Sequence, residues 1–233
     1  MSNHWRLAFM FDAPGGDLSS LELNLKRSVE RIVGIAGDAH VRLGVADTHP
    51  DLGFLREYGG TKLRSVDAAV EVSVAASRIG DLPRIAASLR DSIESLADRL
   101  SIEIMTGPVF PIVPVREGEA FLSLAFRRYP GTTSEQFRAW WLHQHSKVAT
   151  PVLGEGLLAY DQIHVDHAAT EQVAREFGVA PVAYDAYDNL TWAGRDAFLH
   201  SISDAADMAR VNADEVGHID DPSRRSALMR RIY

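Results

Sequence analysis

The chain has 233 residues, of which 46% are hydrophobic, and a formal net charge of −8 with no run rich in lysine and arginine. This length allows one large domain or two small ones, and the acidic balance argues against nucleic acid as a partner. Cysteine is absent, which excludes disulfides and cysteine-based metal or nucleophilic chemistry. No signal peptide or membrane-spanning run is recognisable, so we expect a cytoplasmic protein without a membrane partner.

The first half is predicted to follow the order β-α-β-β-α-β. Short or alternating apolar runs predict strands over 7–11, 41–45, 66–74 and 101–105. Helical spacing and start signals at Asp17 and Pro83 predict helices over 17–36 and 81–98. The segment 48–63 is rich in glycine and proline, which indicates a loop.

The second half is predicted to repeat this order after an irregular linker. Three prolines and no periodicity place the linker at 108–118. Strands are then expected over 120–128, 157–165, 184–192 and 227–232, and helices over 134–150, 170–177 and 195–216. We therefore predict an α+β protein with two domains, 1–107 and 119–233. Each would be a ferredoxin-like unit, and the apolar faces of the two sheets would pack together as an α+β barrel.

A candidate general base lies in the expected helix over 134–150. Phe137, Trp141, His145 and Val148 share one helix face, so His145 points toward the sheet or toward a cavity beside it. A neutral imidazole titrates near working pH and suits acid–base catalysis. The alternative is a core histidine bonded to a backbone carbonyl. His143 lies roughly opposite on the helix and is expected in solvent.

The next strand presents three polar side chains on one face. Tyr160, Gln162 and His164 alternate along it, which suits a polar patch in a barrel cavity, although an exposed strand face would give the same pattern. His164 could pair with His145 as acid and base, and Tyr160 or Gln162 could hold a substrate oxygen.

A carboxylate follows on the strand over 184–192. Asp188 shares a face with Trp192 and needs a partner, which could be a histidine or Arg128. It could orient a catalytic histidine, act as a base itself, or form a structural ion pair. Trp141 and Trp192 are candidates for a pocket wall, although tryptophans at this spacing also occur in ordinary cores.

Several motifs of the second half resemble the EthD family of the dimeric α+β barrel superfamily. These are the strand ending in Arg128, the helix opening Ser134-Glu135-Gln136-Phe137, Trp141 followed by His145, the strand Tyr160-Asp161-Gln162-Ile163-His164, the segment from Asp188 to Trp192, and Ile219-Asp220. The resemblance covers roughly residues 120–233. It implies that the first half is a degenerate copy that mainly completes the barrel, and superfamily habit makes a homodimer an expectation.

The sequence and the resemblance together suggest a cofactor-independent lyase, dehydratase or isomerase. His145 would be the main base, with His164 as its acid partner and Asp188 as the orienting carboxylate. Tyr160, Gln162, Trp141, Arg128 and Trp192 would bind a small aromatic or cyclic substrate. The alternatives are a cofactor-free monooxygenase of a phenol and a non-catalytic accessory protein that binds small molecules. We expect no metal, haem or nucleotide cofactor.

Overall fold

The computed structural model describes residues 3–58, 61–64, 66–114 and 116–233. The strands are β1 (His4–Phe11), β2 (His40–Ala46), β3 (Glu57–Tyr58), β4 (Thr61–Lys62), β5 (Ala68–Ala75), β6 (Glu103–Val113), β7 (Ala120–Arg128), β8 (Leu157–His164), β9 (Ala186–Trp192) and β10 (Ile219–Arg231). The α-helices are α1 (Leu18–Ala36), α2 (Leu82–Glu94), α3 (Ser134–Trp140), α4 (Ser146–Leu153), α5 (His167–Phe177), α6 (Arg195–Ser201) and α7 (Ala205–Glu215). Gly59 and Gly60 of the expected loop and Val115 of the expected linker lie outside the described residues.

The sheet confirms the predicted tandem of ferredoxin-like units. Its strands close into one barrel in the order β1-β5-β2-β10-β7-β9-β8-β6. Within each half the first strand lies between the third and the fourth, as β6-β1-β5-β2 and β10-β7-β9-β8. The halves join through the antiparallel pairs β2–β10 and β6–β8. The barrel therefore closes within a single chain and needs no second copy to complete it.

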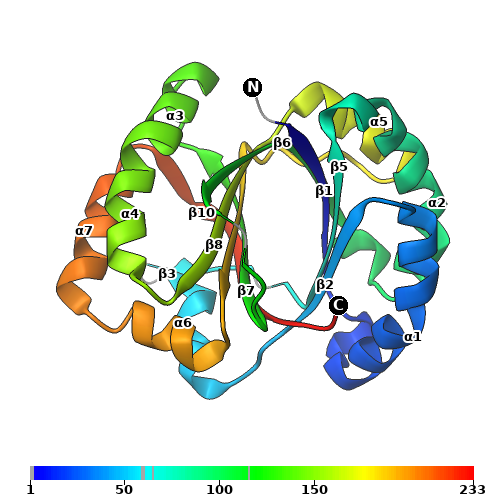
Figure 1. Cartoon of the computed structure of the whole chain (residues 1–233), viewed down its shortest axis with the longest axis horizontal. Helices are drawn as coiled ribbons and strands as arrows, with labels where there is room; N and C mark the ends of the chain where they lie inside the picture. Colours follow the sequence, from blue (N-terminus) through cyan, green and yellow to red (C-terminus); the bar gives the residue numbers. More distant parts are fainter. Residues whose placement is uncertain (1–2, 59–60, 65, 115) are drawn as a thin grey trace.

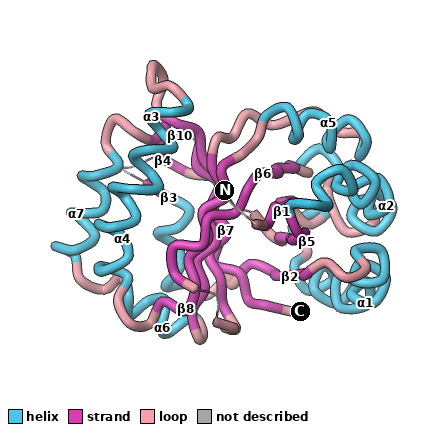
Figure 2. Tube along the Cα trace, turned by 45° about the horizontal axis from the view of Figure 1, so that its top comes forward, coloured by secondary structure: helices cyan, strands magenta, loops and turns pink. Residues whose placement is uncertain are grey.

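The helices form two groups on opposite sides of the barrel (Figures 1 and 2). Helices α1, α2 and α5 lie on one side, and α3, α4, α6 and α7 lie on the other (Figure 1). Helix α1 begins where the Asp17 side chain accepts the amide of Ser20, and it buries Leu21, Leu25 and Ile32 against the sheet. None of the helices in the described ranges is both long enough and apolar enough to span a membrane.

The expected linker over 108–118 is wrong in its first part, because β6 continues to Val113. Residues 103–108 pair with β1 and residues 109–113 pair with β8, so this strand changes neighbours along its length. The pairing with β8 has a register shift between Pro111 and Val113, and a proline has no amide proton to donate to a neighbouring strand. A Cβ at Gly107 would lie 2.1 Å from the carbonyl oxygen of His164, so only glycine allows this close approach. The domain boundaries at 107 and 119 stay a prediction.

Polar and charged side chains occupy the barrel interior around Glu71. Its Oε1 accepts hydrogen bonds from Tyr187 Oη and Asn189 Nδ2, both at 2.5 Å. Its Oε2 lies 3.5 Å from Arg6 Nη1 and 3.6 Å from Arg42 Nε. Burial alone would raise the pKa of Glu71, but the two arginines outweigh it, so the pKa is lowered. The interior is thus held by mutually compensating charges.

Each half also extends over the other through the connection between its second and third strands. In the second half this connection is α5, whose Val173 and Phe177 belong to the apolar core of the first half. The Phe177 ring lies 5.4 Å from that of Phe9. In the first half the connection contains the short 3-10 helix Pro50–Arg56, whose Leu52 belongs to an apolar cluster of the second half. Each of these two insertions therefore packs against the other half of the barrel, and we call them the exchanged insertions.

Replacing Glu71 by Ala should lower the free energy of unfolding by about 3–5 kcal/mol, because Arg42 would lose its paired carboxylate while its charge stays buried. Arg6 would keep its ion pair with Asp161, at 2.7 Å. Urea denaturation followed by circular dichroism measures this. The control is Glu171→Ala, which removes an exposed pair with Arg175 on α5 and should cost less than about 0.5 kcal/mol. Equal effects of the two substitutions would show that the interior ion pairs do not hold the barrel.

Candidate active site

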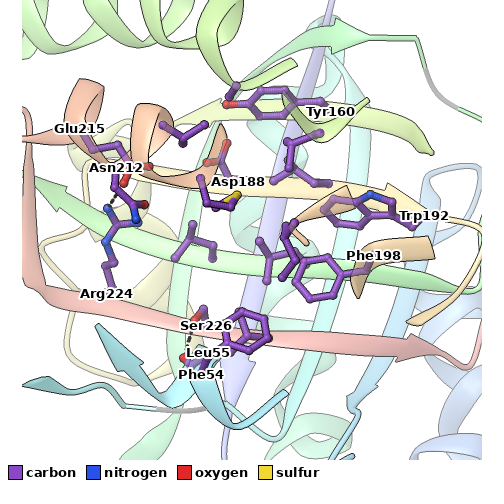
Figure 3. A pocket seen from close by; sticks show the side chains of 18 of the residues that line it. Phe54, Leu55, Tyr160, Asp188, Trp192, Phe198, Asn212, Glu215, Arg224 and Ser226 are labelled. Atoms are coloured by element: carbon purple, nitrogen blue, oxygen red, sulfur yellow. Dashed lines mark hydrogen bonds and ion pairs between the residues drawn. The ribbon is translucent and has the colours of Figure 1, made fainter. Parts of the chain in front are cut away.

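A cavity of about 780 Å³ lies between the sheet of the second half and its helices. Strands β7–β10, helices α4, α6 and α7, and the segment Pro50–Arg56 contribute to its wall (Figure 3). Its volume is in the range of roughly 300–1,000 Å³ that small-molecule sites have. Most of the lining side chains are apolar, and a few polar ones are grouped together at one end (Figure 3).

The alternation of side chains along β8 and β9 decides which residues reach this cavity. Tyr160 of β8 and Asp188, Leu190 and Trp192 of β9 point away from the barrel interior and line the cavity. Their neighbours in sequence point inward, as Asn189 does toward Glu71. The cavity is therefore on the helix-facing side of the sheet.

A helix with one widened turn presents His145. A capping box begins α3, in which the Thr133 hydroxyl accepts the amide of Gln136 and the Gln136 side chain accepts the amide of Thr133. Residues Trp141–His145 then form a π turn, so the expected regular helix over 134–150 is interrupted. The Trp141 carbonyl accepts both the Ser146 amide and, at 2.9 Å, the side chain of Gln162. Such π turns are frequent at functional sites.

Helix α7 supplies the hydrogen-bond partner of His145. The imidazole Nδ1 lies 2.9 Å from Asp214 Oδ2. Because a carboxylate can only accept, Nδ1 carries the proton, and in the neutral ring Nε2 is left as the acceptor. Nε2 lies 3.9 Å from Glu215 Oε1 at the edge of the cavity. This arrangement orients the ring as a general base would require.

The expected single helix over 195–216 is divided into α6 and α7. Asp204 caps α7 by accepting the amides of Ala206 and Asp207. Because α7 restarts there, four of its side chains at helical spacing line the cavity, namely Met208, Val211, Asn212 and Glu215.

A directional chain of hydrogen bonds leads to Asp188. Gln162 Nε2 donates to Tyr160 Oη at 3.0 Å, and Gln162 Oε1 lies 3.4 Å from His164 Nε2. Because Tyr160 Oη accepts from Gln162, its own proton is available to the neighbouring Asp188, whose pKa the hydroxyl group lowers. Asp188 Oδ1 has no hydrogen-bond partner among the described residues.

The surroundings of Asp188 favour its protonated form. The residue is only 5% exposed. Burial raises its pKa well above the ordinary 3.8 and the charge of Glu215 adds to this, while Arg224 and the Tyr160 hydroxyl act in the opposite direction more weakly. Burial and the neighbouring Asp188 also raise the pKa of Tyr160 well above its usual value. A protonated carboxyl group can donate a hydrogen bond or a proton into the cavity.

Four of the eight predicted site residues line the cavity, namely His145, Tyr160, Asp188 and Trp192. The other four do not belong to its wall. Gln162 and Trp141 lie behind it, where the glutamine joins the π turn to Tyr160. Arg128 forms an ion pair with Asp185 and donates to the Thr132 carbonyl at 2.8 Å. Arg128 is therefore held in a structural ion pair.

His164 is also separate from the cavity, which removes the geometric basis for pairing it with His145. Its ring lies between Phe110, at 4.6 Å, and Trp141, at 4.7 Å between centroids. Burial lowers the pKa of His164 to about 3, and the charges of Arg138 and His143 act in the same direction. The expected polar patch of Tyr160, Gln162 and His164 is real, but it faces the helices rather than the barrel interior.

Several cavity residues could not have been selected from the sequence. Asp214, Glu215 and Arg224 approach His145 and Asp188 only through the packing of α7 and β10 on the sheet. Arg224 Nη2 donates to Glu215 Oε2 at 2.7 Å, and its Nε donates to Asp221 Oδ1 at 3.0 Å. For Glu215 the sequence did contain a signal. It lies seven positions after Met208, so it is a charged residue on the apolar face of α7.

Within the described ranges, no group of three or more His, Asp and Glu side chains is placed to hold a metal ion.

The structure is an α+β barrel with a cavity between the sheet and the helices of its second half. Residues 129–222 match the EthD domain family, which confirms the resemblance expected of the second half. No curated protein matches the chain in sequence.

Solved structures with the same fold share little sequence with this chain. A proposed monooxygenase from Fusobacterium nucleatum has a TM-score of 0.57 and 8% identity over 100% of this chain and 94% of its own. An anthrone oxidase-like protein has a TM-score of 0.56 and 10% identity, covering 100% and 92%. A mutant chlorite dismutase from Candidatus Nitrospira defluvii has a TM-score of 0.54 and 12% identity, also covering 100% and 92%. At such identities these likenesses establish the fold alone.

Replacing Asp188 by Asn should stabilise the protein at pH 7 by on the order of 1 kcal/mol. The folded-state pKa of Asp188 is raised, so its contribution to stability is complete below the unfolded pKa and is lost as the pH rises toward the folded value. The gain should therefore vanish near pH 4. Chemical denaturation at a series of pH values measures it, with the exposed Asp91→Asn as control. A pH-independent loss of stability in Asp188→Asn would contradict the raised pKa.

Proposed function

We propose that the protein is a cofactor-independent enzyme that moves protons on a small aromatic or cyclic substrate, as a dehydratase, another lyase or an isomerase. The observation that carries the proposal is the placement of two complementary groups on one cavity wall. One is a histidine oriented by Asp214, and the other is Asp188, whose pKa is raised by burial. Pairs of titratable groups with opposed environments are typical of acid–base catalysis.

In a dehydration, Nε2 of His145 would take a proton from the carbon next to the one that carries a hydroxyl group. The electron pair of the broken C–H bond forms the new double bond, and the C–O bond breaks. Asp188 gives its proton to the departing oxygen, which leaves as water. A proton then passes from His145 to Asp188 through solvent and restores both groups. An isomerisation uses the same two groups with no leaving group.

The acid partner in this proposal is Asp188 rather than His164, since His164 lies outside the cavity wall and its pKa is lowered to about 3. Tyr160 would hold Asp188 in position through its hydroxyl group. Trp192 would form part of the wall that excludes water from the substrate ring.

A second candidate is a cofactor-free monooxygenase acting on a phenol in the same cavity. It is favoured by the fold shared with the proposed monooxygenase and the anthrone oxidase-like protein. His145 would then deprotonate the phenol, and molecular oxygen would be the oxidant. Oxygen consumption coupled to substrate loss separates this candidate from proton transfer alone. A protein that only binds its ligand would show neither.

Replacing His145 by Ala should reduce turnover by ~10²–10⁴-fold. The assay is a panel of hydroxylated aromatic and cyclic compounds followed by mass spectrometry, in which dehydration removes water, isomerisation keeps the mass and oxygenation adds an oxygen atom. The matched control is His143→Ala, because His143 is exposed on the same turn and does not line the cavity. Its turnover should match that of the wild type.

A second variant separates the role of the base from its orientation. Asp214→Asn keeps the size of the side chain but can present an amide proton to Nδ1, which would favour the wrong tautomer of His145. Turnover should fall while the thermal unfolding temperature changes little. Full activity in His145→Ala with the fold intact would remove the histidine from the mechanism.

A further inference from the structure

The cavity has two chemically different ends. Trp192, Phe198 and Phe54 form an aromatic end, Glu215 and Arg224 lie at the opposite, polar end, and Asp188 lies between Glu215 and Trp192 (Figure 3). The Trp192 and Phe198 rings meet edge to face with centroids 4.9 Å apart. A ligand that fills the cavity would therefore have a ring at one end and a polar group at the other.

One ring of the aromatic end comes from the first half of the chain. Phe54 belongs to the 3-10 helix Pro50–Arg56, which reaches across the barrel to the second half. Its ring is nearly parallel to that of Phe198, with an interplanar angle of 13° and centroids 6.3 Å apart. Phe54 lines the cavity and is nevertheless 45% exposed. A bound ring would cover this exposed surface.

The exchanged insertions have different consequences for the two halves. Phe177 of α5 is fully buried and fills the helix layer of the first half. Phe54 comes from the corresponding connection of the first half, and it lines the cavity of the second half instead of filling it. The first half thus does more than complete the barrel, because it supplies one wall of the site in the second half.

Between the two ends, Asp188 is the group without a complete set of partners. It is 95% buried, since only 5% of it is exposed, and Oδ1 has no hydrogen-bond partner among the described residues. The neighbouring Tyr160 hydroxyl group acts on this carboxyl group as a donor, since it lowers the pKa of Asp188. A buried polar atom that lines a cavity and lacks a partner indicates a ligand group that would complete it.

The charges around Asp188 indicate the sign of that ligand group. Arg224 is engaged by both Glu215 and Asp221, at 2.7 and 3.0 Å. Asp214 adds a further carboxylate on the far side of His145. An anionic ligand would therefore meet an excess of negative groups, whereas a neutral oxygen acceptor would meet a hydrogen-bond donor.

We propose that the ligand of this cavity is a neutral aromatic molecule with a carbonyl or similar acceptor oxygen, whose oxygen binds Asp188 and whose ring binds Phe54 and Phe198. This inference deepens the function proposed above and rests on the same cavity. It assigns the hydrogen-bond donor to the second half and part of the ring recognition to the first half.

The test uses probes that share one bicyclic skeleton, with affinities measured by calorimetry. Tetralone carries a neutral carbonyl, tetralin has no oxygen, tetralin carboxylate is anionic and aminotetralin is cationic. Tetralone should bind about tenfold more tightly than tetralin, which corresponds to one hydrogen bond. Its affinity should also exceed that of the carboxylate by about tenfold or more. The saturated analogue decalone should bind more weakly than tetralone, because it lacks the aromatic ring.

Two pairs of variants assign these preferences to residues. Asp188→Leu should remove the preference for tetralone over tetralin, whereas Asp188→Asn, which keeps a donor, should retain most of it. Phe54→Leu should weaken tetralone binding several-fold and change decalone binding less. The control for Phe54 is Leu100→Ala, since Leu100 is 95% exposed and does not line the cavity. Thermal unfolding confirms that each variant is folded.

Four outcomes would overturn the inference. Tighter binding of aminotetralin than of tetralone would show that Asp188 acts as a carboxylate toward a cation. Tighter binding of the carboxylate would show that Arg224 is the recognition group. Equal affinities for tetralone and tetralin would show that Asp188 does not bind the ligand oxygen. Equal affinities of Phe54→Leu and the wild type for tetralone would show that Phe54 does not bind the ligand ring. These results are independent of the turnover of His145→Ala, so the proposed reaction can stand or fail separately.

Discussion

The balance of charge inside the barrel is the constraint on which the placement of the site depends. Glu71 lies between Arg6 and Arg42, and Tyr187 and Asn189 donate hydrogen bonds to its Oε1. A set of buried charged side chains is favourable only when every member is paired. The side chains of the barrel interior therefore serve to stabilise the fold. The other face of the same strands is then the face on which a cavity can form, between the sheet and the helices.

The alternation of side chains along β8 and β9 decides which residues point into the barrel and which point into the cavity. On β9, Asn189 joins the interior network, while its neighbour Asp188 enters the cavity, where burial and Glu215 favour its protonated form. A shift of one residue in the register would exchange these two roles. Gln162, on β8, does not touch the cavity but fixes both Tyr160 and the π turn that carries His145.

Local patterns predicted most of the fold. The strand over 120–128 was predicted with its observed bounds, and the Asp17 start of α1 follows from capping chemistry. The tandem ferredoxin-like order followed from the sequence of elements. The linker over 108–118 could not be predicted correctly, because prolines hide a strand whose two neighbours come from different halves. The π turn was also not predicted, and its Trp141 carbonyl accepts a hydrogen bond from a side chain distant in sequence, that of Gln162.

The site was predictable only in part, for a related reason. His145, Tyr160, Asp188 and Trp192 could be chosen because each lies on a recognisable face of one element. The pairing of His145 with His164 has no support from the cavity wall, to which His164 does not belong, and spacing within elements says nothing about which faces meet. Asp214 and Phe54 come from segments that reach the cavity through the closure of the barrel and the exchange of insertions. Closure within one chain also means that a homodimer, if formed, serves a purpose other than completing the sheet.

The central claim is that a ligand binds between the sheet and helices α4 and α7, beside His145. The most direct measurement is the NMR spectrum of the histidine side chains during titration with tetralone. The account predicts that the ring signals of His145 shift, while those of the exposed His143 and of His164, which lies outside the cavity wall, stay in place. A shift of His164 with His145 unchanged would contradict it, because the ligand would then bind elsewhere in the fold.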